Sequence, residues 1–327
     1  MLRCFAVVLL LVSTSRIAPA QQAPCNVPVN VAAEKLSYPV PTRFHAAKWG
    51  FPPELWLPAR GLRPEDFVVR DGHHSVPVLS VETETGPRRV VFVVAYGRGG
   101  AAATQPLSID AGPAGAQINV ILSNARPEDS FGLLNAWGPH LSVPLGSSLD
   151  ALRQVLRVLS PGAGRPQGDA VLDALREVSG WFGAPQAGDS IFLVGGSEHW
   201  PRGRTSQVCS ALVSRGIRLF VLGAWASAGE CEAWLPCLES LSPDGTLAEE
   251  TGGGWESIGY RGPNAADENV WLWQNEAKSL YDMATSSYVL RLPKAGPHLK
   301  IELSPEGLSH LQWPPRISYP RPLPVCP

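Results

Sequence analysis

The sequence lacks ligating or reactive side chains at the turn that follows its most apolar internal segment. Residues 90–94 form an unbroken apolar run, which is typical of a central strand buried on both faces of a parallel α/β sheet. Open α/β sheets bind their ligands at the carboxyl ends of the strands. At alternate positions the turn there has Ala95, Gly97 and Gly99, and none of these has a side-chain oxygen. The sequence therefore predicts the scaffold of a binding crevice without its usual carboxylates and hydroxyls.

Other functional signatures are also missing. No later apolar stretch is long enough to span a bilayer, and no stripe of basic residues indicates nucleic-acid binding. No pair of CxxC motifs or paired histidines has the spacing of a zinc site. The glycine-rich residues 97–100 lack the third glycine of a dinucleotide-binding loop and the lysine of a phosphate-binding loop. We interpret them as a plain turn.

What the chain does have begins with an export signal. Arg3 precedes the apolar residues 5–12, and Ala18-Pro19-Ala20 fits a small-residue cleavage site. We predict removal of residues 1–20, with an uncleaved anchor as the alternative. Cleavage removes two arginines and changes the net charge from −2 to −4. The protein is then exported to the periplasm, the cell surface or the medium, which the sequence does not distinguish.

Five cysteines stay in the mature chain, and export permits disulfides. Cys231 and Cys237 are close enough in sequence for a local bridge. Cys25 and Cys326 lie at the two ends, and because chain termini are often neighbours they are candidates for a second bridge. Cys209 is then left as a buried thiol on the apolar face of a helix.

The periodicity predicts three regions after the signal: an N-terminal β module over residues 21–86, an α/β domain over 87–286 and a C-terminal β segment over 287–327. In the first, residues 62–72 end in an Asp-Gly turn, and 76–81 would be the returning strand of a hairpin. In the second, strands at 90–94, 131–137, 191–194 and 217–222 alternate with helices at 114–123, 149–159, 169–182, 205–215 and 268–285. Ser147 or Ser148 would cap the second helix, and residues 251–255 would form a turn. Strands at 288–292, 298–303 and 311–319 complete the chain. The alternation predicts a doubly wound, mostly parallel α/β sheet.

The order of several short motifs resembles bacterial VWFA-related proteins, which carry a von Willebrand factor type A-like domain. The similar segments are Leu62–Gly72, Arg88–Val94, Val171–Leu175, Leu247–Gly253 and Ser287–Leu290. The resemblance implies a type A-like, Rossmann-like sheet with small flanking β segments. It also implies a secreted, non-enzymatic module for protein–protein or surface interaction, as in adhesion.

Many type A domains hold a magnesium ion through an Asp-x-Ser-x-Ser turn, a threonine and a later aspartate, because hard cations require oxygen ligands. By the resemblance, the turn falls on Ala95, Gly97 and Gly99, and the later aspartate falls on Gly195. The threonine falls near Asp169. The sequence therefore predicts a degenerate site with no metal and no cofactor.

The residues expected to bind a partner lie in the loops at the carboxyl ends of the strands: Tyr96, Arg98, Asp169, Glu198, His199 and Trp200. The partner would be an unknown protein or cell-surface component, and the oligomeric state is not specified. One alternative is a metal-dependent or hydrolytic enzyme that uses Asp169, Ser197, Glu198 and His199. Residues 195–199 are similar to a nucleophile elbow but lack its final glycine. A purely structural scaffold is the third possibility.

Overall fold

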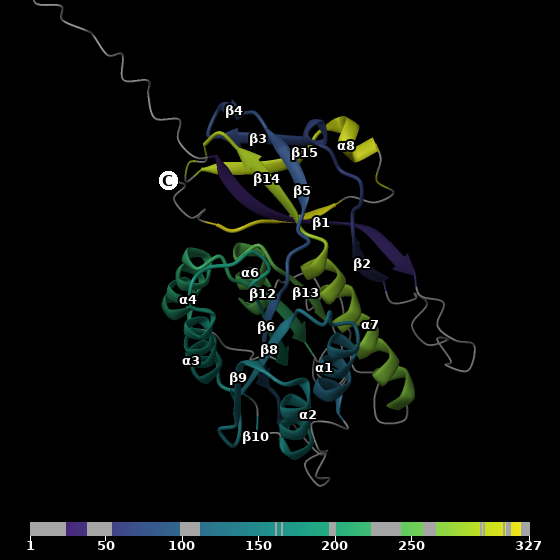
Figure 1. The fold of residues 1–327 in the computed structure, drawn as a ribbon, viewed down its shortest axis with the longest axis vertical. Coiled ribbons are helices and arrows are strands. Elements are labelled where there is room, and N and C mark those ends of the chain that lie inside the picture. Colours follow the sequence, from purple (N-terminus) through teal and green to yellow (C-terminus); the bar gives the residue numbers. More distant parts are fainter. Residues whose placement is uncertain are drawn as a thin grey trace, which may run out of the picture.

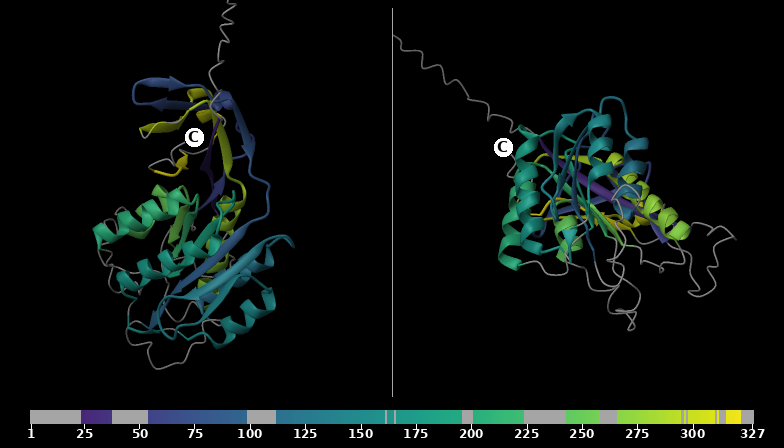
Figure 2. Two further views of the ribbon diagram at one scale, coloured as in Figure 1. Left: turned by 60° about the vertical axis from the view of Figure 1, so that its left-hand side comes forward. Right: turned by 90° about the horizontal axis from the view of Figure 1, so that it is seen from below.

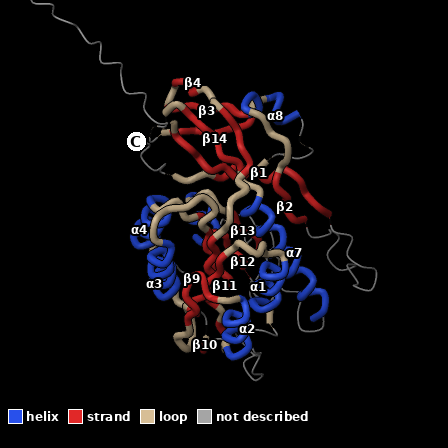
Figure 3. The backbone as a smooth tube through the Cα atoms, in the orientation of Figure 1, coloured by secondary structure: helices blue, strands red, loops and turns tan. Residues whose placement is uncertain are grey.

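A computed structural model describes residues 24–37, 54–98, 112–160, 162–164, 166–195, 201–223, 243–257, 266–294, 296, 298–309, 311 and 315–321. The predicted signal, residues 1–20, lies outside this set. The described chain forms an α/β domain and a β module stacked end to end (Figure 1). Helices and the six-stranded sheet occupy one part, and mostly strands occupy the other (Figure 3).

The α/β domain is built on a six-stranded sheet with the order β13-β12-β11-β6-β8-β9. The strands are β6 (Arg89–Ala95), β8 (Ser130–Asn135), β9 (Ser142–Ser147), β11 (Ser190–Gly195), β12 (Arg218–Gly223) and β13 (Gly254–Ser257). Every neighbouring pair is parallel except β8 with β9. In chain order this is the 3-2-1-4-5-6 arrangement of doubly wound sheets. The predicted fold class is therefore confirmed.

Helices cover both faces of the sheet, as Figure 2 shows. Helices α1 (Pro113–Ser123), α2 (Leu149–Val158) and α7 (Ala266–Thr285) pack on the face that carries Val90, Phe92 and Val94. Helices α3 (Gly168–Ser179), α4 (Arg202–Ser214) and α6 (Pro243–Glu250) pack on the opposite face with Val91 and Val93. The strand period of two divides one apolar run between two cores, which explains why β6 has no polar residue after Arg89.

The β module combines strands from both ends of the chain. Its larger sheet has the order β16-β1-β14-β5, with β2 also paired to β1. These strands are β1 (Cys25–Ser37), β2 (Glu54–Pro58), β5 (Ser80–Thr83), β14 (Tyr288–Leu292) and β16 (Arg316–Ser318). A smaller sheet, β15-β3-β4, contains β3 (Phe67–Asp71), β4 (His74–Val76) and β15 (Leu299–Leu303), with α8 (Pro305–Ser309) beside it. Folding of this module therefore requires residues from both ends of the described chain.

The structure corrects three details of the predicted elements. The returning strand at 76–81 is wrong, because β4 ends at Val76 while β5 starts at Ser80 and pairs with β14 in the other sheet. The turn at 251–255 is too long, since β13 begins at Gly254. Strand β9 was not predicted, because Pro144 and Gly146 interrupt its apolar pattern. Of the two proposed caps of α2, Ser148 is the one that accepts a hydrogen bond from the Ala151 amide, at 3.2 Å.

A buried ion pair joins the two domains at the amino-terminal ends of the parallel strands. Arg218, the first residue of β12, donates from Nη2 to Oε2 of Glu84 at 2.8 Å, and the two side chains are 2% and 4% exposed. Arg218 also donates to Ser287, whose hydroxyl donates to Asn30 at 2.8 Å. Asn30 of β1 donates in turn to the carbonyl of Gly252. The network therefore links β1 and the residues next to β5 and β14 to the first residue of β12 and to the turn before β13.

Two chain connections run between the domains, and both lie beside this network. The amide of Glu84 donates to the carbonyl of Ser287 at 2.9 Å. Arg88, 1% exposed, donates from Nη2 to the carbonyls of Thr285 at 2.6 Å and Glu84 at 3.3 Å. The exit from β5 and the entry to β14 are thus hydrogen-bonded to each other.

We predict that Glu84→Gln lowers the free energy of unfolding by about 3–5 kcal/mol, because it leaves the charge of Arg218 buried without its partner. Urea denaturation measures the loss. Glu82→Gln, two residues earlier in β5, is the control, since Glu82 is exposed, and it should change stability by less than about 0.5 kcal/mol. The double variant Glu84→Gln/Arg218→Met should recover about half of the loss, because no unpaired charge is left. Equal stability of Glu84→Gln and the control would contradict this account.

Candidate functional site

The sheet reverses its strand order between β6 and β11, and the carboxyl ends of these strands form the point at which doubly wound folds bind ligands. Ala95 and Gly195 are the last residues of the two strands and lie opposite each other in the ladder. We call the strand ends at this side of the sheet the carboxyl edge. It lies at the end of the α/β domain away from the β module (Figure 1), because the module contacts the strand starts.

The main chain itself fills part of the carboxyl edge. After β6 the chain continues as β7 (Gly97–Arg98), which pairs in parallel with β10 (Gly162–Ala163). The amide of Gly162 donates to the carbonyl of Tyr96 at 3.2 Å. A Cβ on Gly162 would meet Nε1 of Trp137 at 2.7 Å, so glycine is required for this indole to lie against the backbone. Residues 97 and 98 are therefore a strand paired with β10, and the prediction of a plain turn is wrong for these two residues.

Gly195 occupies the position at which the type A resemblance requires an aspartate. Its φ is +89°, a region that residues with a side chain rarely adopt. A Cβ built there would lie 2.9 Å from the carbonyl carbon of Ala95 and still closer to its oxygen. Ala95 is itself buried and has no side-chain oxygen. The backbones of β6 and β11 thus approach too closely at this point for any carboxylate.

Asp169 lies in the first turn of α3 and is exposed. Its carboxylate accepts a hydrogen bond from Arg204 of α4 at 2.5 Å, and Arg204 also contacts Asp173. The hydrogen bond with Asp169 and the charge of Asp173 raise the pKa of Arg204, so the arginine stays protonated. The carboxylate of Asp169 is therefore engaged with a cation from its own chain.

The structure describes only some of the residues predicted for the site. Tyr96 is half-buried against the core beneath α1, α2 and α7. Arg98 lies in β7, and its side chain is outside the described part of the chain. Gly99, Ser197, Glu198, His199 and Trp200 are outside it as well, together with Cys231, Cys237 and Cys326.

Two contributors to the carboxyl edge were missed by the sequence analysis. Trp137 lies two residues beyond the end of β8 at Asn135, and the sequence analysis had placed it inside the predicted strand 131–137. Arg204 was missed because its ion pair with Asp169 spans 35 residues, and no local pattern indicates such a pairing.

Within the described residues, no group of three or more histidine, cysteine, aspartate or glutamate side chains is placed to hold a metal ion. No helix in that same part of the chain is long and apolar enough to cross a membrane. Of the two described cysteines, Cys209 is free and buried, whereas Cys25 is not free.

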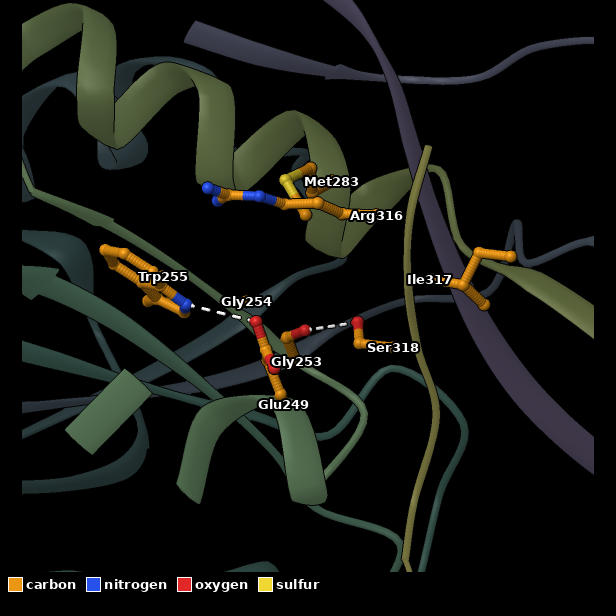
Figure 4. A pocket seen from close by; sticks show the side chains of 8 residues that line it. All are labelled: Glu249, Gly253, Gly254, Trp255, Met283, Arg316, Ile317 and Ser318. Atoms are coloured by element: carbon orange, nitrogen blue, oxygen red, sulfur yellow. Dashed lines mark hydrogen bonds between the residues drawn. The ribbon is translucent and has the colours of Figure 1, made fainter. Parts of the chain in front are cut away.

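A cavity of about 240 Å³ lies at the other end of the α/β domain, between this domain and the β module (Figure 4). Its walls come from the end of α6, the start of β13, α7 and β16. The lining residues are Glu249, Gly253, Gly254, Trp255, Met283, Arg316, Ile317 and Ser318. It is thus separate from the carboxyl edge.

No family model matches the sequence, and no curated protein matches it. Among solved structures, the chain is similar to a von Willebrand factor type A protein from Catenulispora acidiphila, with 13% identity and a TM-score of 0.41 over 80% of this chain and 51% of that one. It is also similar to the conserved hypothetical protein BatB from Bacteroides thetaiotaomicron, with 16% identity and a TM-score of 0.40 over 62% of this chain and 100% of that one. A third likeness is to the pilus adhesin SpaC from Lactobacillus rhamnosus GG, with 14% identity and a TM-score of 0.39 over 66% and 34% of the two chains.

The chain spans about half the length of the first of these structures. The first of these structures is named for the type A domain, and the sequence motifs of this chain resemble the same family. All three likenesses are distant, and the fold class stands on the strand order of this chain.

We predict that Gly195→Ala lowers the free energy of unfolding by at least about 3 kcal/mol, because strain at positive φ is added to the clash with Ala95. The matched control is Gly146→Ala in β9, where φ is +88° and nothing lies within 4 Å of an added Cβ. It should lose only about 1–2 kcal/mol from the backbone strain. Chemical denaturation of both variants measures the difference. Losses of the same size would show that β6 and β11 do not approach as closely as described.

Proposed function

We propose that this chain is an exported, non-enzymatic interaction module that binds a protein or a cell-surface component through its carboxyl edge without a metal ion. The doubly wound sheet supports this proposal, because folds of this type bind at that edge. The predicted contact residues are Tyr96, Arg98, Asp169, Glu198, His199 and Trp200.

The proposal that binding needs no metal ion rests on one observation, the close approach of Gly195 to Ala95. A magnesium site needs several oxygen ligands in a fixed arrangement, and a carboxylate at residue 195 would displace β6 or β11. The residues at the first and last ligand positions of the type A pattern therefore do not fit the ion. Asp169 lies near the threonine position, and its carboxylate is engaged by Arg204, which also contacts Asp173.

Export is part of the proposal, on the basis of the predicted signal at residues 1–20. The state of the two described cysteines supports it, since Cys25 is not free while Cys209 is. The predicted partner of Cys25 is Cys326, because the two residues lie at the two ends of the chain and chain termini are often neighbours. Peptide mapping without reduction identifies the bridge, and a different partner for Cys25 would overturn this pairing.

We predict that magnesium, manganese and calcium produce no saturable rise in the melting temperature of the mature protein relative to EDTA. A ligand that binds only the folded state raises its stability by mass action, so thermal unfolding detects a bound ion whatever its role. Asp169→Ala tests the remaining carboxylate, and Asp173→Ala is the matched control, since Arg204 contacts both. A saturable rise that only Asp169→Ala removes would favour the metal-dependent or hydrolytic alternative.

We predict that the partner captured by the mature chain from an extract of the producing cells stays bound in EDTA. The triple variant Arg98→Ala/His199→Ala/Trp200→Ala should lose at least about tenfold in affinity, because charged and aromatic anchors carry most interface energy. The control is Glu82→Ala/Arg291→Ala/Lys300→Ala, whose positions are exposed on the β module. Loss of binding in the control variant alone would move the interface to the β module, and release by EDTA would contradict metal independence.

A further inference from the structure

The contact between the two domains has a second part, which we call the C-terminal seam. In it, residues 316–321 lie along residues 249–255, at the end of α6 and the start of β13. Four contacts join the two stretches. The guanidinium of Arg316 lies 5.1 Å from the ring centroid of Trp255, and Ser318 Oγ donates to the carbonyl of Gly253 at 2.5 Å. Pro320 forms a β-bridge with Thr251, and the amide of Arg321 donates to the carbonyl of Glu250 at 2.6 Å.

The C-terminal seam is unevenly packed: Pro320 lies close against Gly252, whereas the end at Arg316 and Trp255 borders an open pocket. The pocket of about 240 Å³ lies at this end of the seam, and Arg316 extends across it toward Trp255 (Figure 4). Trp255 is itself only partly buried and donates from Nε1 to Glu249 at 3.2 Å. Protein interiors are normally close-packed, and side chains that line a void lack dispersion contacts on that side. The seam is therefore held mainly by a few polar contacts.

The rest of the interface is much more firmly held. The buried pair Glu84–Arg218 and both chain connections lie there, and Ala32 of β1 packs without exposure in the core that includes α7. Regions with few buried apolar contacts open at lower free energy than the core around them. The seam can thus separate with loss of the Asn30–Gly252 hydrogen bond, while the chain connections and the Glu84–Arg218 pair stay intact.

Cys209 lies directly beneath the C-terminal seam. Its side chain is on α4, and Sγ lies 3.7 Å from the carbonyl oxygen of Arg321. The residue is 4% exposed, and burial, together with the nearby Glu250, raises the pKa of the thiol to about 12. A reagent in solution reaches this thiol only after residues around Arg321 move away.

We propose that the C-terminal seam is a latch that opens while both domains stay folded, and that each opening uncovers the Cys209 thiol. Arg316 is the residue that closes it, since its guanidinium spans from the β module to Trp255 of the α/β domain. The latch gives the protein a second conformation at the contact between the β module and the α/β domain, far from the carboxyl edge.

The rate at which N-ethylmaleimide modifies Cys209 in the native mature protein measures the opening. Mass spectrometry of the peptide that contains Cys209 separates this thiol from the others. We expect modification at least about tenfold faster than global unfolding, which a denaturant jump measures independently. Arg316→Ala should speed it about two- to fivefold, because it removes a cation–π contact. Arg291→Ala is the control: Arg291 is exposed on β14 of the same module, and the rate should not change.

Two further measurements distinguish opening of the seam from poor folding of a variant. Circular dichroism and thermal melting of each variant verify that the fold is retained, and Ser318→Ala provides an independent way to weaken the seam. Amide exchange should also be faster in residues 316–321 than in β6. Modification of Cys209 at the global unfolding rate, or equal rates in the wild type, Arg316→Ala and Ser318→Ala, would overturn the proposal.

Discussion

The architecture depends on the buried pair between Arg218 and Glu84. Arg218 is the first residue of a central strand of the α/β sheet, and Glu84 lies just beyond β5 of the β module. Each charge loses its hydration on folding, so each is tolerable only with the other in place. Ser287 and Asn30 extend the pair into the strands that come from both ends of the chain. The two domains therefore share a buried site that neither can complete alone.

This constraint also determines which side of the sheet is open to a partner. The β module is joined to the amino-terminal ends of the strands, so it cannot cover their carboxyl ends. At those ends Gly195 lies against the backbone of Ala95, and neither residue has a side-chain oxygen that could bind a cation. These two observations, the uncovered carboxyl ends of the strands and the close approach of Gly195 to Ala95, are the basis of the proposed function.

Elements with a strong local pattern were predictable from the sequence. The apolar run at 90–94 lies within β6, and the spacing of leucines after the candidate caps Ser147 and Ser148 identifies α2. Strand β9 was not predictable, since Pro144 and Gly146 break its alternation and it owes its place to pairing with β8. At the candidate site, Ala95 and Gly195 could be assigned to strand ends, but their close approach depends on the register of β6 with β11. The partners of Arg218 are distant in sequence, with Glu84 134 residues away, and no local pattern indicates them.

The central claim is that the β module and the α/β domain form one cooperative unit through their shared buried pair. Differential scanning calorimetry of the mature protein tests this most directly. The account predicts a single transition in which the calorimetric and van't Hoff enthalpies agree. Two separable transitions, one for each domain, would contradict it.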